Sequence, residues 1–119
     1  MANDFIRICT PNVSNSGNST IYAVPAGASS AALESIVIGI TAANKTSSGV
    51  TVDIFIDNED GSNDVFIVKG ASIPAGASLE VMAGNKLVLQ NDGSNGDNLE
   101  ALASAANSVD ITVSVLQDV

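Results

Sequence analysis

The sequence contains no histidine and no tryptophan, and its 119 residues include a single cysteine, Cys9. Without histidine the chain lacks the commonest general base and the commonest metal ligand, which excludes Ser-His-Asp triads, histidine zinc sites and imidazole pH switches. One cysteine cannot form an intrachain disulfide, so the small secreted scaffolds held together by cysteine pairs are excluded too. We therefore expect a protein that is not an enzyme and that binds no cofactor or metal.

Positive charge is also scarce, because 13 acidic residues stand against 4 basic ones and the formal net charge is −9. The cations are scattered along the sequence at Arg7, Lys45, Lys69 and Lys86. A chain of this charge repels phosphates and anionic lipid, so we expect no nucleic acid or membrane partner. No stretch approaches the roughly 20 apolar residues of a membrane helix, and no basic segment precedes an apolar one at the N-terminus. We expect synthesis in the cytoplasm without a signal peptide.

The residues that are abundant favour strands and turns. Valine and isoleucine total 24 against 7 leucines, and serine, asparagine and glycine number 15, 12 and 10. This balance predicts an all-β fold, a single antiparallel β-sandwich of jelly-roll or immunoglobulin-like type with about eight strands. Apolar residues make up 45% of the chain, but 16 of them are alanine and only four are aromatic. The core should therefore be aliphatic and thin.

Alternation of apolar and polar residues marks the strands, most clearly over residues 50 to 57 and 109 to 116. In the first of these segments Phe55 is an apolar residue that falls on the outward side. Residues 99 to 106 have high helix propensity, but their alternation and their place before the last strand favour a strand. The remaining predicted strands cover residues 5 to 10, 20 to 24, 31 to 43, 65 to 69, 79 to 82 and 87 to 90.

The first 19 residues differ from the rest of the chain. A short strand pattern ends at Pro11, and residues 12 to 19 are almost all asparagine, serine and glycine, which bury little surface. We expect residues 1 to 19 to form an N-terminal strand and flexible arm, and residues 20 to 119 to form the β-sandwich domain. An extended arm can add a strand to the exposed sheet edge of a neighbouring subunit. Its deletion should then leave a folded domain that fails to join an assembly.

A turn hexapeptide occurs twice, at residues 24 to 29 and 73 to 78, with only the first residue changed from valine to isoleucine. Proline followed by glycine at this spacing predicts a chain reversal, and each copy leads into a strand that contains a Leu-Glu pair. The repeat has two explanations. It indicates either a duplication that gave two halves built on one plan, or a turn that the chain uses twice.

An acidic loop is the one candidate for chemistry. Asp57, Glu59, Asp60 and Asp64 lie close together in the sequence beside a glycine, and such oxygen ligands suit Ca²⁺. Their spacing does not match an EF-hand loop, so a solvated hairpin tip is the favoured interpretation. A pair of carboxylates can also hydrolyse glycosides, but that chemistry needs a cleft lined by sugar-stacking aromatic residues, which the chain lacks.

Cys9 is the remaining reactive side chain. The only nearby cation is Arg7, two residues away on the same face of the predicted strand, and nothing else would favour a thiolate. We expect Cys9 to act as a small buried or half-buried apolar residue.

Several of these segments, taken in order, resemble those of small bacteriophage virion structural proteins. The matching pieces are residues 21 to 27, 36 to 40, 73 to 81, 87 to 89, 96 to 97 and 109 to 116. Residues 1 to 19 lie outside the match, and residues 91 to 95 lengthen a loop within it. The resemblance implies a compact antiparallel β-sandwich without enzymatic activity that binds other virion subunits, as capsid decoration or cement proteins do.

The resemblance implies a protein located in the virion, and we expect it to be made in the cytoplasm of the host. Its expected partners are the major capsid protein or other virion subunits, and further copies of itself in the assembled particle. Outward apolar side chains such as Val37 and Phe55 should contact those neighbours, because a monomer would carry more charge there.

Two other functions remain open. The chain could instead be a component of the tail, neck or a fibre, since the same fold serves there. It could also be a carbohydrate-binding module for host adhesion, in which case saccharide binding would depend on Tyr22 or on a loop cation such as Lys45.

Overall fold

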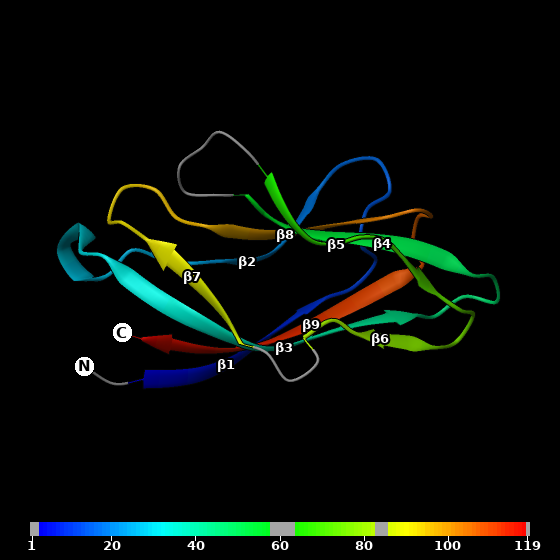
Figure 1. The fold of residues 1–119 in the computed structure, drawn as a ribbon, viewed down its shortest axis with the longest axis horizontal. Helices are drawn as coiled ribbons and strands as arrows, with labels where there is room; N and C mark the ends of the chain where they lie inside the picture. The colour runs from blue at the N-terminus through cyan, green and yellow to red at the C-terminus, as the bar shows by residue number, and fades with distance from the viewer. Residues whose placement is uncertain (1–2, 58–63, 83–85, 119) are drawn as a thin grey trace.

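Alternation gives most strands one apolar face, and two sheets bury those faces against each other. The computed structural model describes residues 3–57, 64–82 and 86–118, and Figure 1 shows the two sheets as an upper and a lower layer. The elements in chain order are β1 (Asn3–Thr10), β2 (Ser19–Ala23), the short 3₁₀ helix η1 (Ala28–Ser30), β3 (Leu33–Asn44), β4 (Val50–Asp57), β5 (Asp64–Ile73), β6 (Ser78–Glu80), β7 (Leu87–Asn91), β8 (Asn98–Ala103) and β9 (Val109–Asp118). The predicted all-β sandwich is confirmed.

Every strand pairing that the structure describes is antiparallel. One sheet has the order β1-β9-β3-β6, with β7 also paired to β3, and the other has the order β2-β8-β4-β5. β9 runs along one edge of β3, while β7 and β6 share the opposite edge end to end. The strand predicted within residues 99 to 106 is confirmed as β8, which lies between β2 and β4. No helix in the described ranges is long and apolar enough to cross a membrane.

The core between the sheets is aliphatic, as the composition predicts. The largest fully buried side chains are Ile21, Ile40, Ile54, Ile73, Leu89, Leu99, Ile111, Val13, Val37, Val52, Val109 and Val113. The inward positions predicted for β9 are confirmed, because its alternate residues from Val109 to Val115 are buried. Small and medium side chains fill the space between the sheets, so the core is thin.

A bulge in β3 changes which residues face the core. The pairing of β3 with β9 shifts register between Val37 and Gly39, so the inward series passes from Val37 to Ile40. Val37 is therefore fully buried, at 0% exposure, and Ile38 points outward at 39%. The prediction that Val37 lies on an outer face is wrong, because sequence alternation alone does not reveal the extra residue of a bulge.

Phe55 is likewise not available to a neighbouring subunit. Register shifts occur on both sides of Ile54 in the pairing of β4 with β5, and Phe55 is only 3% exposed. The centroid of its ring lies 5.0 Å from that of Phe66, and the Lys69 ammonium lies 4.6 Å from the Phe66 ring centroid. The prediction of an exposed Phe55 is wrong, because β5 places an aromatic ring against it.

Much of the N-terminal segment belongs to the sandwich. β1 pairs with β9 at eight positions, from Asn3 opposite Asp118 to Thr10 opposite Ile111. Farther along, the Val13 side chain is fully buried and its backbone N–H donates to the Val109 carbonyl at 2.9 Å. The chain thus pairs with its own β9 where we expected an arm directed at a neighbour. The division at residue 19 remains a sequence-based prediction.

The repeated hexapeptide adopts two different backbone conformations. In the second copy, Gly76 has a φ of 69° and the Ala77 N–H donates to the Pro74 carbonyl at 3.0 Å, closing a tight turn. In the first copy, Gly27 has a φ of −71° and its N–H donates to the Ala31 carbonyl at 2.7 Å. Both copies carry the chain from the four-stranded sheet to the five-stranded one, so they share a place in the topology without sharing a conformation.

The burial of Val13 predicts a measurable loss of stability on truncation. Val13→Ala should lower the free energy of unfolding by about 2 kcal/mol, because it removes two buried methyl groups and leaves a cavity. Val65→Ala is the matched control, and it should change the free energy by less than about 0.5 kcal/mol because Val65 is 49% exposed. Urea denaturation measures both. Equal stability of the two variants would show that the segment after β1 is detached from the core.

Candidate functional site

The acidic loop lies largely outside the residues that the structure describes. Glu59 and Asp60 fall within residues 58 to 63, so both the favoured solvated hairpin tip and the alternative Ca²⁺ site lie outside the described residues. Asp57 and Asp64 are described, and they lie opposite each other where β4 and β5 pair. Among the described residues, no group of three or more histidine, cysteine, aspartate or glutamate side chains is placed to hold a metal ion.

Cys9 is exposed, so the expectation that it is buried or half-buried is wrong. The reason is its phase in β1, where Ile6 and Ile8 take the inward positions against the core. Arg7 lies two residues away on the same outer face and is exposed as well. The pair is therefore part of a solvent-facing surface.

Tyr22 bridges the two sheets from the inside. Its hydroxyl donates to Gln117 Oε1 at 2.7 Å and lies 2.8 Å from Ser35 Oγ, which can donate to it. β2 supplies the tyrosine, while β3 and β9 supply its two partners. Burial raises the pKa of the Tyr22 phenol, and the Ser35 hydrogen bond offsets part of that rise. Because Tyr22 is only 6% exposed, it has little surface to offer a saccharide, which removes one of the two contacts that the carbohydrate-binding alternative depends on.

Lys45 ties together three segments that are distant in the sequence. Its ammonium lies 3.0 Å from Asp110 Oδ1 and donates to Asn12 Oδ1. The Asn12 N–H also donates to Asp110 Oδ1, at 2.9 Å. That backbone donor holds the pKa of the Asp110 carboxyl below its usual range, and Lys45 adds to the effect. Lys45 follows the end of β3 opposite to Ser35, so the structure does not bring the two predicted saccharide residues together.

The outer face of the four-stranded sheet carries a shallow polar depression of about 300 Å³. It is lined by Asn15, Thr51, Asp53, Leu102, Ala103 and Ser104. Asp53 is the one titratable residue among these, and its carboxylate is already engaged. It accepts the Gly70 N–H at 2.6 Å and lies 3.6 Å from the Lys69 ammonium. A single paired carboxylate provides no acid–base couple, so the depression can offer hydrogen bonds to a ligand but no evident catalysis.

The outer face of the five-stranded sheet carries a row of apolar side chains that crosses four strands. Residues opposite each other in antiparallel strands point to the same face, and the pairing places Phe5, Leu116, Ile36 and Val88 in one line. Phe5 is 78% exposed and Val88 is 54% exposed, while the two middle residues are half-buried. We call these four residues the apolar row. The sequence does contain one signal for this row, since alternation places Phe5 and Arg7 on the same face of the first strand. It does not contain the register that aligns the four strands.

Comparison with known proteins finds a solved structure of similar fold. No family model matches the sequence, and neither does any curated protein. The chain is similar to a chain in the structure of infectious bursal disease virus, Gx strain, with a TM-score of 0.51 and 13% sequence identity. The alignment covers 98% of this chain and 31% of the viral chain, so this chain spans less than a third of that length. At such identity the likeness shows a shared β-sandwich fold.

The Tyr22 bridge predicts a specific dependence of stability on pH. The folded chain has the higher phenol pKa, so the contribution of Tyr22 is fully present below about pH 10 and is lost as the pH rises through the raised pKa. Tyr22→Phe should remove this dependence on alkaline pH. It should also lower the free energy of unfolding by about 1 to 2 kcal/mol, because the buried Ser35 hydroxyl loses its partner.

Denaturant unfolding at several alkaline pH values, run on both proteins, measures the two effects. Tyr22 is the only tyrosine in the sequence, so its ultraviolet titration is free of overlap from other phenols. Identical stability and identical pH profiles in the two proteins would contradict the proposed role of the hydroxyl.

Proposed function

We propose that this chain is a structural protein of a bacteriophage virion, and specifically a capsid decoration or cement protein that stabilises contacts between capsid subunits. The observation that carries the proposal is the fold likeness, which extends over 98% of the chain, to a chain from a virus structure. The ordered resemblance of residues 20 to 116 to small phage virion proteins supports the phage assignment.

The surfaces of the sandwich support a role in binding other proteins. A cement protein needs apolar surface to bury against its neighbours, and the apolar row supplies it on the five-stranded sheet. Among the described strands, β1 pairs with β9 alone, so its other edge can accept a strand from a partner. Its partners would be the major capsid protein or other virion subunits, together with further copies of the chain.

The chemistry of the described residues supports a role without catalysis. Asp53 and Asp110 are each paired with a lysine, and the Tyr22 hydroxyl is used within the core. Each of these groups forms its hydrogen bonds or ion pairs within the chain, where they stabilise the fold. Such groups keep a small sandwich with a thin core folded while its outer faces contact other subunits.

Copy number tests this proposal. We expect the chain to be present in purified particles at a molar ratio close to that of the major capsid protein, because a cement protein occupies repeated sites on the shell. Quantitative mass spectrometry of intact particles measures the ratio. A far lower ratio would place the chain in the tail, neck or a fibre, and its absence from particles would contradict a virion role altogether.

Saccharide binding tests the remaining alternative, in which the chain is a carbohydrate-binding module for host adhesion. A glycan array probed with the full chain should give no signal, because Tyr22 is buried and Lys45 is held by Asp110. Specific binding that is lost on Asp53→Asn or Thr51→Ala would instead assign the depression on the four-stranded sheet to host adhesion.

A further inference from the structure

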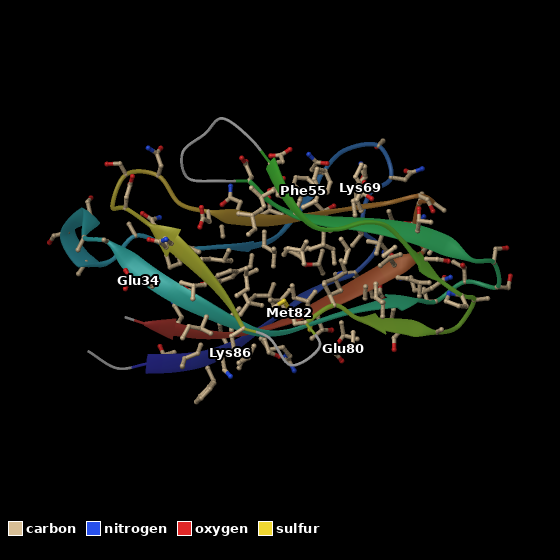
Figure 2. The ribbon with its side chains drawn as sticks, viewed as in Figure 1. Glu34, Phe55, Lys69, Glu80, Met82 and Lys86 are labelled. Carbon is tan, nitrogen blue, oxygen red and sulfur yellow. The ribbon has the colours of Figure 1, made fainter. Side chains whose placement is uncertain are left out.

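The charges on either side of the apolar row have opposite signs. Two residues from the apolar row, in one direction along the strands, the outer face carries Arg7 next to Phe5 on β1 and Lys86 next to Val88 on β7. In the other direction it carries Glu34 beside Ile36, with Gln90 opposite Glu34 on β7. Figure 2 shows Glu34 on β3 and Lys86 at the start of β7. Each step of two residues is about 6.8 Å, so both sets of charges lie at the border of a contact centred on the row.

The cations beside the row are the ones not used within the chain. Lys45 pairs with Asp110 and Lys69 pairs with Asp53, whereas Arg7 and Lys86 form no ion pair among the described residues. A chain with a net charge of −9 repels its own copies, so any contact between copies must lie where positive charge is locally available. The outer face of the five-stranded sheet meets that condition, because it holds both of these cations next to exposed apolar side chains.

The arrangement of positive and negative charges around the apolar row indicates which partner binds this face. A uniformly acidic partner would attract Lys86 but repel Glu34, and a uniformly basic partner would do the reverse. A second copy rotated by 180° about an axis along the apolar row presents the signs in reversed order, so Lys86 of each copy approaches Glu34 of the other. The same rotation lays Phe5 and Val88 of one copy over their counterparts, which is the self-complementarity that a two-fold interface requires.

We propose that two copies of this chain pack face to face through the outer faces of their five-stranded sheets, about a two-fold axis that runs along the apolar row. Two sheets can pack in this way at a spacing of about 10 Å, with their side chains interleaved. The dimer buries Phe5, Leu116, Ile36 and Val88, and it pairs Lys86 with Glu34 twice. Its formation can be measured on the isolated chain with no particle present, so it goes beyond the proposed function.

Sedimentation equilibrium of the full chain tests the apolar contact. The wild-type chain should sediment with twice the monomer mass of 11.9 kDa, and Phe5→Glu/Val88→Glu should sediment as a monomer. Both substituted residues are exposed, so the fold should persist, and circular dichroism checks it. The matched control is Val65→Glu, an exposed apolar position at the edge of the four-stranded sheet, and it should remain a dimer.

Charge reversal tests the axis itself. Lys86→Glu should weaken the dimer about tenfold at low salt, because it places like charges together at two symmetric positions. Lys86→Glu/Glu34→Lys should recover wild-type affinity, because position 86 of each copy again faces the opposite charge at position 34 of the other. Glu80→Lys, also on the outer face but farther from the row, is the control for net charge and should not rescue Lys86→Glu.

Three results would overturn the dimer. The first is a wild-type chain that stays monomeric at about 1 mM, where even a millimolar contact is detected. The second is a dimer that survives Phe5→Glu/Val88→Glu, and the third is a failure of the charge swap to restore affinity. Binding of the chain to particles is a separate assay, so a monomer that still binds them would refute the dimer and leave the proposed function intact.

Discussion

Burial of aliphatic side chains between the two sheets is the interaction on which the rest of the structure depends. Each strand must direct one series of residues inward. In β3, where plain alternation would fail after Val37, a bulge moves the inward series on to Ile40. The buried residues are mostly of small or medium size, so each contributes modestly at about 25 cal/mol per Å². The buried Tyr22 bridge and the surface Lys45–Asp110 pair add polar links between segments that are distant in the sequence.

The sequence was sufficient for those features that depend on local pattern. The alternation in residues 50 to 57 and 109 to 116 predicts β4 and β9, and the strand within residues 99 to 106 follows from its neighbours. It failed where two distant segments set the outcome. Phe55 is covered because β5 brings Phe66 onto it, and Tyr22 is buried because Ser35 and Gln117 meet its hydroxyl. The apolar row likewise needs the register of four strands, which no single segment encodes.

The two outer faces offer different chemistry, and this difference bears on function. On the four-stranded sheet, polar groups are largely satisfied within the chain, as Asp53 is by Gly70 and Lys69 and as Glu100 is by Thr20. On the five-stranded sheet, apolar side chains are exposed and are flanked by charges whose order suits a second copy. A sandwich whose five-stranded sheet exposes an apolar row between opposite charges is suited to assembly.

Electron microscopy of intact particles, at a resolution that shows strands and large side chains, is the most direct test of a virion role. It would show what contacts the outer face of the five-stranded sheet. The expected map shows the two-sheet sandwich on the capsid exterior in contact with neighbouring capsid subunits, with the outer face of its five-stranded sheet covered by a second copy. A map in which the shell carries no such density, or in which that face is bare to solvent, would contradict it.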